Sequence, residues 1–501
     1  MLLGLGKNVA ISVVAFFLVS IFGLLIVPEL IASYGLSGFG LIGIARMLLP
    51  TALLALFDLG YCEISTHSVA ITKVTGSWSY CARHLGLNLA LAFVMGLMSG
   101  MCLFVLSAWI PAWFRVPEVH QSQLTEVIRV TALLQPILLL SLVCEGVLKG
   151  FEFFRSQRLI EVISALSYIG AVFWALDRHL DFRWICYAYL ASLILRAGLA
   201  ACLAGRALSE NRSLPALWSS CEITDFFQRV RILFPNKLIG LAQGQAPSFL
   251  VTILFGPISL GSFDLLTRLP RFTKSVLGLL NSTVQPVGAR LDQLADEPGL
   301  RRLVRIGWIM VAGISAPVLG LAVAFSEPLL RLWIGPGIST LWGWQAAYFV
   351  VPSLGALVGF SGCALLGRTS VMKKINRLSI MNLTLVLFAG LLLGPWLREL
   401  AFVASTFLAA MITMPWSLSM MAYELGLPRS AFIIPVRSYA IALILALPVL
   451  QCVYLIDSFF ALAAIMICWI AFYSIVLIFA GFPPSLRAVT LSRMKASLNI
   501  R

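Results

Sequence analysis

The chain has few charged residues for its length. Of its 501 residues, 11% are Asp, Glu, Lys or Arg and 60% are hydrophobic. An average soluble protein is about 25% charged and about 45–50% apolar. So small a share of charge cannot cover the surface of a soluble globule of this size. The composition excludes a soluble multidomain enzyme, a disordered chain and a secreted disulfide scaffold, and it is typical of a polytopic membrane protein.

Several motifs of enzymes and metal proteins are also missing. The ten cysteines form no Cys-x-x-Cys pair, the four histidines fit no His-Glu-x-x-His pattern, and there is no Gly-x-x-x-x-Gly-Lys-Ser/Thr or Gly-x-Ser-x-Gly motif. We therefore expect no metal, no cofactor and no ATP-binding loop. Membrane glycosyl polymerases and ligases lack these signatures too, but they typically carry a large outer loop, which is absent here. Transport is the leading class, and we expect that the protein is not an enzyme.

Long apolar stretches fill the sequence. A helix of about 20 apolar residues crosses a bilayer, and roughly fourteen such stretches follow one another here. The pattern predicts an all-α polytopic membrane protein. The predicted spans lie near 9–31, 40–62, 85–110, 124–148, 160–177, 184–205, 232–255, 258–285, 303–325, 342–366, 378–394, 399–421, 435–456 and 459–480.

The net charge of +15 reflects where the basic residues lie. With a cytoplasmic N-terminus, 24 of the 36 Lys and Arg fall on the cytoplasmic side, 5 fall on the outer side and 7 lie within spans. Basic residues are retained on the cytoplasmic side of membrane proteins. We therefore predict that both termini are cytoplasmic, and we expect no nucleic-acid partner.

A short repeat divides the chain into two similar parts. Gly35 of the pair Tyr34-Gly35 lies eleven residues before Arg46. Gly256 of the pair Phe255-Gly256 lies twelve residues before Arg268. About 220 residues and six predicted helices separate the two glycines, so the two parts would point the same way. This predicts two six-helix lobes in a parallel pseudo-repeat plus a C-terminal helix pair. The predicted boundaries are an N-terminal lobe at 1–206, a cytoplasmic linker at 207–231, a C-terminal lobe at 232–423, and a helix pair with a cytoplasmic tail at 424–501.

Seven cations lie within the predicted spans. Each costs roughly 2.5–3.5 kcal/mol near the centre of a membrane helix, so each is expected to face a water-filled cavity or a partner. The seven residues are Arg46, Arg129, Arg196, Lys237, Arg268, Arg271 and Lys274.

The span at 258–285 has the most polar face. At about 100° per residue, Asp264, Arg268 and Arg271 fall on one stripe of a helix, and Lys274 flanks it. A net positive stripe of this kind is expected to line a cavity. The alternative is that Asp264 and Arg268, four residues apart, form a structural ion pair, which would leave Arg271 and Lys274 unpaired.

Three further residues leave alternatives open. Arg196, near the middle of its span, lines a cavity or extends toward the inner surface. Lys237 lies near the inner end of a span that Pro and Gly interrupt, as in transporter binding sites, but it could also reach the inner surface. Asp58 is expected to bind a coupling ion or to make a helix contact or cap.

Four segments resemble the lipid-linked oligosaccharide flippases of bacteria, which handle O-antigen and exopolysaccharide repeat units. That family belongs to a superfamily with the multidrug and toxin extrusion transporters. The resemblance covers nearly the whole chain by span count, although the family often has tyrosine where Phe263 stands. The segments are Tyr34-Gly35-Leu36-Ser37-Gly38-Phe39-Gly40, Phe57-Asp58-Leu59-Gly60, Phe255-Gly256, and Gly261-Ser262-Phe263-Asp264 followed by Arg268.

The resemblance implies a fold and a function. Two six-helix lobes would surround a cleft that opens alternately to either face. The substrate would be a polyprenyl pyrophosphate carrying a short glycan, moved to the periplasmic leaflet of the bacterial inner membrane for surface polysaccharide or lipopolysaccharide biosynthesis. H⁺ or Na⁺ would be the coupling ion, with Asp264 and Asp58 as ion sites or structural partners. Membrane lipid and polysaccharide-assembly proteins would be the other partners.

The charge balance of the spans favours the same class of substrate. Guanidinium groups bind phosphates through two parallel hydrogen bonds, and cations lower the cost of bringing phosphate into the membrane. A cation-coupled multidrug exporter of the same fold would need an acidic cavity and is the alternative, followed by a membrane glycosyl polymerase or ligase. The predicted substrate site consists of Arg46, Arg196, Arg268, Arg271, Lys274 and Lys237.

Overall fold

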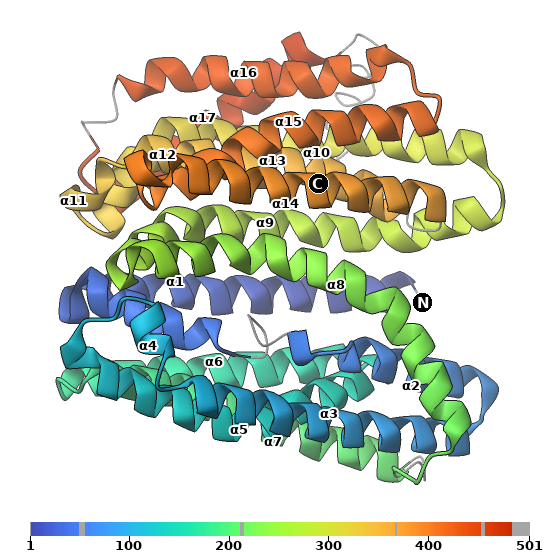
Figure 1. Cartoon of the computed structure of the whole chain (residues 1–501). Helices are drawn as coiled ribbons and strands as arrows, with labels where there is room; N and C mark the ends of the chain where they lie inside the picture. Colours follow the sequence, from blue (N-terminus) through green and yellow to red (C-terminus); the bar gives the residue numbers. More distant parts are fainter. Residues whose placement is uncertain (1, 50–55, 211–214, 366–367, 452–455, 483–501) are drawn as a thin grey trace, which may run out of the picture. The chain divides into compact units, whose positions relative to one another are not determined.

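The computed structural model describes residues 2–49, 56–210, 215–365, 368–451 and 456–482. All regular structure in these ranges is helical, which confirms the all-α polytopic fold (Figure 1). The first helices are α1 (Leu2–Met47), α2 (Tyr61–Thr75), α3 (Trp78–Leu106), α4 (Ile110–Trp113), α5 (Glu118–Gly150), α6 (Phe154–Asp177), α7 (Phe182–Glu210) and α8 (Ser220–Phe255). They are followed by α9 (Pro257–Gln293), α10 (Glu297–Trp333), α11 (Pro336–Ser339), α12 (Trp342–Tyr348), α13 (Val350–Ala364), α14 (Thr369–Leu397), α15 (Leu400–Glu424), η2 (Arg429–Phe432), α16 (Ile433–Leu450), α17 (Phe459–Val476) and η4 (Leu477–Gly481).

Twelve helical segments of the described chain are long and apolar enough to cross a membrane. Two of the predicted spans, 40–62 and 258–285, have no segment of their own among these twelve. The first falls on the end of α1 and the start of α2, which has only 15 residues. The second becomes the 37-residue α9, whose apolar character is lowered by the charged stripe seen in the sequence.

The two glycines of the predicted repeat have the same backbone conformation. Gly35 divides α1 into two helices at a kink with φ 65° and ψ 179°. Gly256, between α8 and α9, has φ 85° and ψ −173°. This region of the backbone map is essentially restricted to glycine. Each glycine therefore allows a sharp change of direction, after which a new helix carries an arginine of the predicted site.

The helices that begin after these glycines cross at close range. A Cβ atom on Gly40 would lie 1.9 Å from the carbonyl oxygen of Pro257, and one on Gly261 would lie 2.7 Å from that of Leu36. Gly261 is the counterpart of Gly40, and Pro257 that of Leu36, each 221 residues further along the chain. A contact in which each side repeats the other is typical of a two-fold relation. The contact supports the parallel repeat that the sequence predicts.

The contacts of the chain divide it into two compact units, Met1–Gly261 and Ser262–Arg501. In the first unit, buried side chains of α2, α3, α5, α6, α7 and α8 form one core that includes Tyr61 and Phe226. In the second unit, one core joins α9, α10, α13 and α15 around Trp308. Another core joins α10, α16 and α17 around Trp469. The C-terminal helix pair therefore packs on α10.

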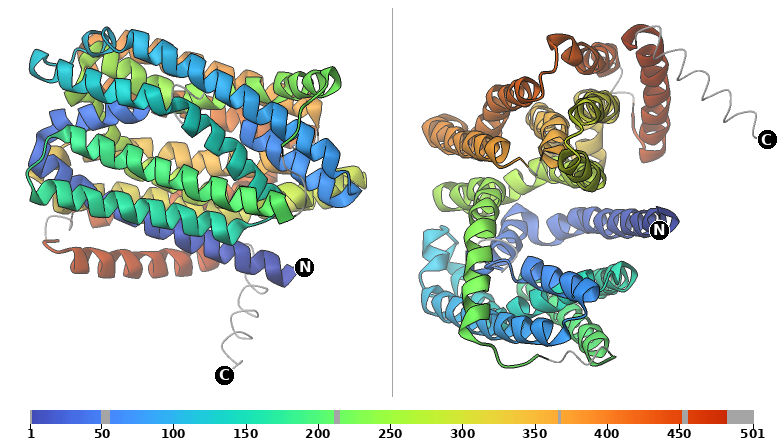
Figure 2. Two further views of the ribbon diagram at one scale, coloured as in Figure 1. Left: turned by 90° about the horizontal axis from the view of Figure 1, so that it is seen from below. Right: turned by 90° about the vertical axis from the view of Figure 1, so that its right-hand side faces the viewer.

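Of the segment predicted as a cytoplasmic linker, 207–231, residues 211–214 lie outside the described ranges, and most of the others are helical. α7 continues to Glu210, and α8 begins at Ser220. Ser219 and Glu222 form a capping box that satisfies the first N–H groups of α8. Figures 1 and 2 show the first part of α8 running across the ends of the other helices of its unit. By its contacts α8 belongs to the first unit. The predicted lobe boundary at 232 stays a prediction.

Candidate functional site

Arg46 lies on the helix that follows Gly35 and contacts two tyrosines. Its Nη2 atom donates a hydrogen bond of 2.5 Å to the hydroxyl oxygen of Tyr168 on α6. Its Cζ atom lies 4.8 Å from the ring centre of Tyr189 on α7 and 5.4 Å from that of Tyr168. The two rings are 5.4 Å apart, at an angle of 75°. A cation over an aromatic face gains about 0.5–2 kcal/mol, so these rings help to hold the guanidinium in place.

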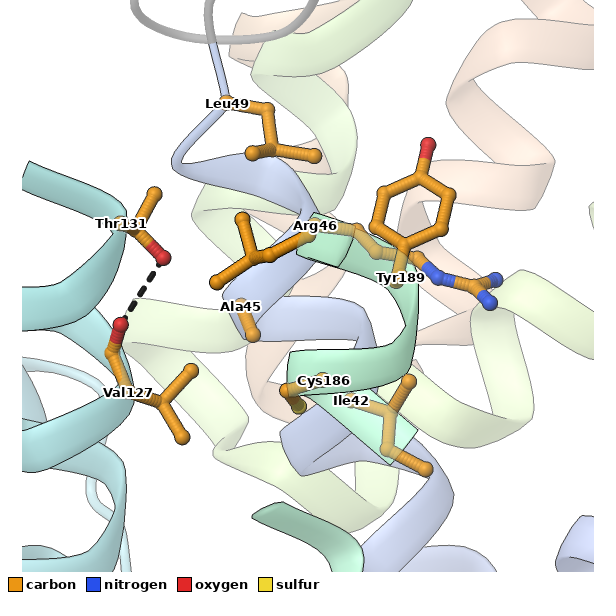
Figure 3. A pocket seen from close by; sticks show the side chains of 9 residues that line it. Ile42, Ala45, Arg46, Leu49, Val127, Thr131, Cys186 and Tyr189 are labelled. Carbon is orange, nitrogen blue, oxygen red and sulfur yellow. Dashed lines mark hydrogen bonds between the residues drawn. The ribbon is translucent and has the colours of Figure 1, made fainter. Parts of the chain in front are cut away.

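A small pocket lies beside Arg46, and Figure 3 shows the Arg46 side chain extending past Tyr189, away from Thr131. The Thr131 hydroxyl donates a hydrogen bond of 2.8 Å to the carbonyl oxygen of Val127 in its own helix. Arg46 and Tyr189 therefore supply most of the polar character of an otherwise apolar pocket. Its lining consists of Ile42, Ala45, Arg46, Leu49, Val127, Thr131, Cys186, Tyr189 and Leu190.

Arg196 on α7 reaches carboxylates on two neighbouring helices. Its Nε atom donates a hydrogen bond of 2.8 Å to Oε1 of Glu145 on α5. Its Nη2 atom lies 3.6 Å from Oε1 of Glu161 on α6. Glu161 also accepts a hydrogen bond of 2.6 Å from Nη1 of Arg158. These charges link three helices of the first unit.

Lys237 on α8 is paired with Asp58. Its Nζ atom donates a hydrogen bond of 2.5 Å to Oδ2 of Asp58 and lies 3.4 Å from Oε2 of Glu63. The other Asp58 oxygen accepts from the backbone N–H groups of Gly60 and Tyr61, at 3.0 and 3.2 Å. Asp58 thus caps the start of α2, which is one of the two roles that the sequence left open. Its role as an ion site stays a prediction.

The polar stripe of α9 is held together by Asp264. Nη1 of Arg271 donates a hydrogen bond of 3.2 Å to Oδ1 of Asp264, and Nη1 of Arg268 lies 3.9 Å from Oδ2. The expectation that an Asp264–Arg268 pair would leave Arg271 unpaired is therefore wrong, since Arg271 is the closer partner. The Arg271 guanidinium also lies 5.6 Å from the ring centre of Phe263. The Lys274 side chain is exposed.

The structure brings only some of the predicted site residues together. Asp264, Arg268 and Arg271 share one face of α9 in the second unit. In the first unit, Arg46 of α1 contacts Tyr189 of α7. Arg196 lies two turns after Tyr189 on α7. Whether any of the six predicted cations meets substrate stays a prediction.

Among the residues that contact these cations, sequence reasoning missed Glu63, Glu145, Glu161 and Tyr168. Glu161 and Tyr168 are seven residues apart on α6, a spacing that places both on one face, so periodicity offered a signal for them. Glu145 is an acid within the predicted span 124–148, and such residues are functional candidates by default. The described residues include no group of three or more His, Cys, Asp or Glu side chains that could hold a metal ion.

A second set of charged contacts joins the start of α8 to α3. Arg83 Nε donates a hydrogen bond of 2.6 Å to Oε1 of Glu222, and the Tyr80 hydroxyl donates one of 3.1 Å to Oδ2 of Asp225. Hydrogen bonds from the hydroxyl and backbone N–H of Ser219, together with that from Arg83, lower the pKa of Glu222 to about 2. These groups stabilise the first turns of α8 in their crossing position.

No family model and no curated protein sequence matches the chain. Its fold does match solved structures. One is lipid II flippase MurJ in an inward closed conformation, with a TM-score of 0.66, 13% identity, and coverage of 94% of this chain and 98% of that one. A multidrug resistance MATE family transporter of the MOP superfamily, facing inward, has a TM-score of 0.62, 13% identity and coverage of 83% and 99%. The MATE transporter VcmN of Vibrio cholerae has a TM-score of 0.57, 14% identity and coverage of 86% and 98%. At these identities the likeness shows a shared fold.

Proposed function

We propose that this chain is a membrane transporter that moves a polyprenyl pyrophosphate-linked oligosaccharide from the cytoplasmic to the periplasmic leaflet by alternating access. The shared fold supports transport, because the solved structures that match are those of a lipid II flippase and of multidrug transporters. The membrane would be the bacterial inner membrane, and the protein would carry out no covalent chemistry. Surface polysaccharide biosynthesis is the process that uses such a substrate.

The observation that carries the proposal is the placement of arginines on the two helices of the repeat. Arg46 follows the kink at Gly35 and lies against tyrosine rings. Arg268 and Arg271 follow Gly256 on α9, with Arg271 against an aromatic ring. A planar guanidinium held in this way presents parallel N–H donors that suit the oxygens of a pyrophosphate.

A cation-coupled multidrug exporter is the second candidate, because MATE transporters share the fold. An exporter of cationic drugs needs carboxylates that can meet the drug. In this chain three acids of the helical region already bind cations of their own unit, which favours an anionic substrate. The pairs are Asp58–Lys237, Glu145–Arg196 and Asp264–Arg271.

Flipping can be measured in proteoliposomes that contain the purified protein. The probe is a polyprenyl pyrophosphate disaccharide with a fluorescent group that dithionite quenches only in the outer leaflet. We expect the parent protein to move the probe from the inner to the outer leaflet, where dithionite quenches it. Arg46→Ala should abolish this movement. Arg46→Lys should retain part of it, since an ammonium keeps the charge but lacks the two parallel N–H donors of a guanidinium. The control is Arg398→Ala, an exposed arginine at the end of α14, which should keep the parent rate.

Two other results would overturn the proposal. Export of ethidium driven by a proton or sodium gradient, without exposure of the lipid probe, would favour the exporter. Formation of new glycosidic bonds by the purified protein would favour a polymerase or ligase.

A further inference from the structure

Glu145 and Arg196 form an ion pair within helices that are candidate membrane spans. Arg196 lies midway along α7, and Glu145 lies near the C-terminal end of α5. The Glu145 side chain is 11% exposed, whereas that of Arg196 is 32% exposed. Among the described residues, the hydrogen bond recorded for the Glu145 carboxylate comes from Arg196. A nearly buried carboxylate therefore binds a cation that is itself accessible.

The two carboxylates near Arg196 lie along the Nε/Nη2 edge, one of the two edges of the guanidinium that can bind a phosphate. Nε is bound to Glu145 at 2.8 Å, and Nη2 lies 3.6 Å from Glu161. A phosphate binds most strongly to two parallel N–H donors of a guanidinium. Because Glu161 is also fixed by Arg158 at 2.6 Å, Glu145 is the carboxylate that an arriving phosphate would displace.

Displacement has a consequence for the charge on Glu145. A buried carboxylate that loses its cation is costly, and such a group takes up a proton instead. One negative charge of the phosphate then replaces the charge of Glu145 beside Arg196. Proton uptake by Glu145 therefore cancels one of the negative charges that the pyrophosphate brings into the site.

We propose that Glu145 is the exchangeable counterion of Arg196. The pyrophosphate of the substrate displaces Glu145 from the guanidinium, and Glu145 takes up one proton from water as the substrate binds. The inference rests on the proposed function and extends it. It names the proton as the ion whose binding is coupled to that of the substrate, and Glu145 as the positioning residue that leaves Arg196 free to bind the phosphate.

Groups on four helices surround Glu145. Lys149 lies one turn further along α5, but its Nζ atom donates a hydrogen bond of 3.2 Å to Sγ of Cys62 on α2. This contact holds the second nearby cation away from the exchange. The titratable and charged groups that face Glu145 are Cys62 on α2, Cys144 and Lys149 on α5, Arg158 and Glu161 on α6, and Arg196 on α7.

The test uses full-length protein in lipid nanodiscs and farnesyl pyrophosphate as the probe. The dissociation constant is measured between about pH 7 and about pH 8, where uptake of one proton makes it rise by up to about tenfold. We expect this rise for the parent, and we expect Glu145→Gln to bind the probe more tightly at the upper pH with little pH dependence. The control is Glu126→Gln on the same helix, whose carboxylate binds Arg183 at 2.7 Å, and it should keep the parent pH dependence.

The outcomes separate the inference from the proposed function. If the parent does not bind farnesyl pyrophosphate, or if Arg196→Gln binds it as well as the parent, Arg196 is not part of a phosphate site and both proposals lose their support there. If Arg196 is needed but Glu145→Gln keeps the parent pH dependence, the phosphate site stands and the counterion exchange is wrong. A weakly buffered titration with a pH indicator tests the parent without any variant. Uptake of one proton per probe bound supports the exchange, and uptake of none contradicts it.

Discussion

Replacing Gly40 by alanine should destabilise the first unit. The new Cβ atom would lie 1.9 Å from the carbonyl oxygen and 2.6 Å from the carbonyl carbon of Pro257. Both neighbours are backbone atoms of the first turn of α9, so a side-chain rotation cannot relieve the contact. The two helices would have to separate at the place where the counterparts Gly40 and Gly261 meet.

The expected size of the effect follows from two opposing contributions. Overpacking of a well-packed contact costs about 1–3 kcal/mol. Alanine in place of glycine within a helix returns about 1 kcal/mol. Gly170→Ala on α6 isolates this second contribution, because a Cβ atom there would meet nothing within 4 Å. The difference between the two variants should therefore be about 1–3 kcal/mol. Gly261→Ala, with its nearest contact at 2.7 Å, should show a smaller effect of the same sign.

The assay is the apparent melting temperature of purified protein in one detergent at one scan rate. For a unit of this size, 1 kcal/mol corresponds to about 2–4 °C, so Gly40→Ala should melt about 2–12 °C below Gly170→Ala. Equal melting temperatures for these two variants would refute the close crossing. A larger loss for Gly261→Ala than for Gly40→Ala would contradict the order of the contact distances.

Four further predictions concern the charged residues and the topology. Arg271→Ala should abolish flipping at normal protein level, while Arg271→Lys retains part of it because an ammonium lacks the bidentate fork; parent rates for both would remove Arg271 from the site. Asp58→Ala should be less stable than Asp58→Asn by about 0.5–2 kcal/mol, because asparagine keeps an oxygen that can cap α2, and equal thermal stability of the two variants would contradict the cap. Single cysteines at Ser209 and Arg398 in a cysteine-free background should label differently with an impermeant thiol reagent, and equal labelling would contradict the predicted topology. The folded pKa of Glu222, about 2, lies below its ordinary value of 4.5, so its contribution to stability is present above about pH 4.5 and is lost as the pH falls toward 2. Glu222→Gln should therefore flatten the dependence of melting temperature on pH in that window, and an unchanged profile would show that Glu222 does not contribute.

Much of the fold could be predicted because the bilayer leaves few choices. Apolar runs of span length indicate helices, and the spacing of Gly35 and Gly256 before their arginines indicates the repeat. The reciprocal contact of Gly40 and Gly261 could not be predicted, since it depends on how two helices cross in space. The helical character of 220–231 was missed because the segment is polar and lies outside any span, although Ser219 and Glu222 have the spacing of a capping box.

The partners of the site residues were harder to predict than the residues themselves. Intramembrane cations are visible in a sequence because they are costly there. Their partners depend on the rotation of each helix about its axis, which tertiary packing sets. Lys237 and Asp58 are 179 residues apart, and Arg196 and Glu145 are 51 apart. Spacing along one helix carries no information on either pair.

The contacts within α9 show what spacing along one helix can still provide. Arg271 lies seven residues after Asp264, so the two share a face as closely as residues four apart do. Side chains in a helix lean toward its N-terminus, so the long Arg271 side chain can reach back over two turns to Asp264. Its Nη1 atom lies 3.2 Å from Asp264, and that of Arg268 lies 3.9 Å away. A single carboxylate is thus shared by two arginines, with Lys274 beside them. Because one negative charge cannot neutralise three positive ones, the stripe stays net positive after its internal pairing, and the charge argument for an anionic substrate does not depend on which arginine is paired.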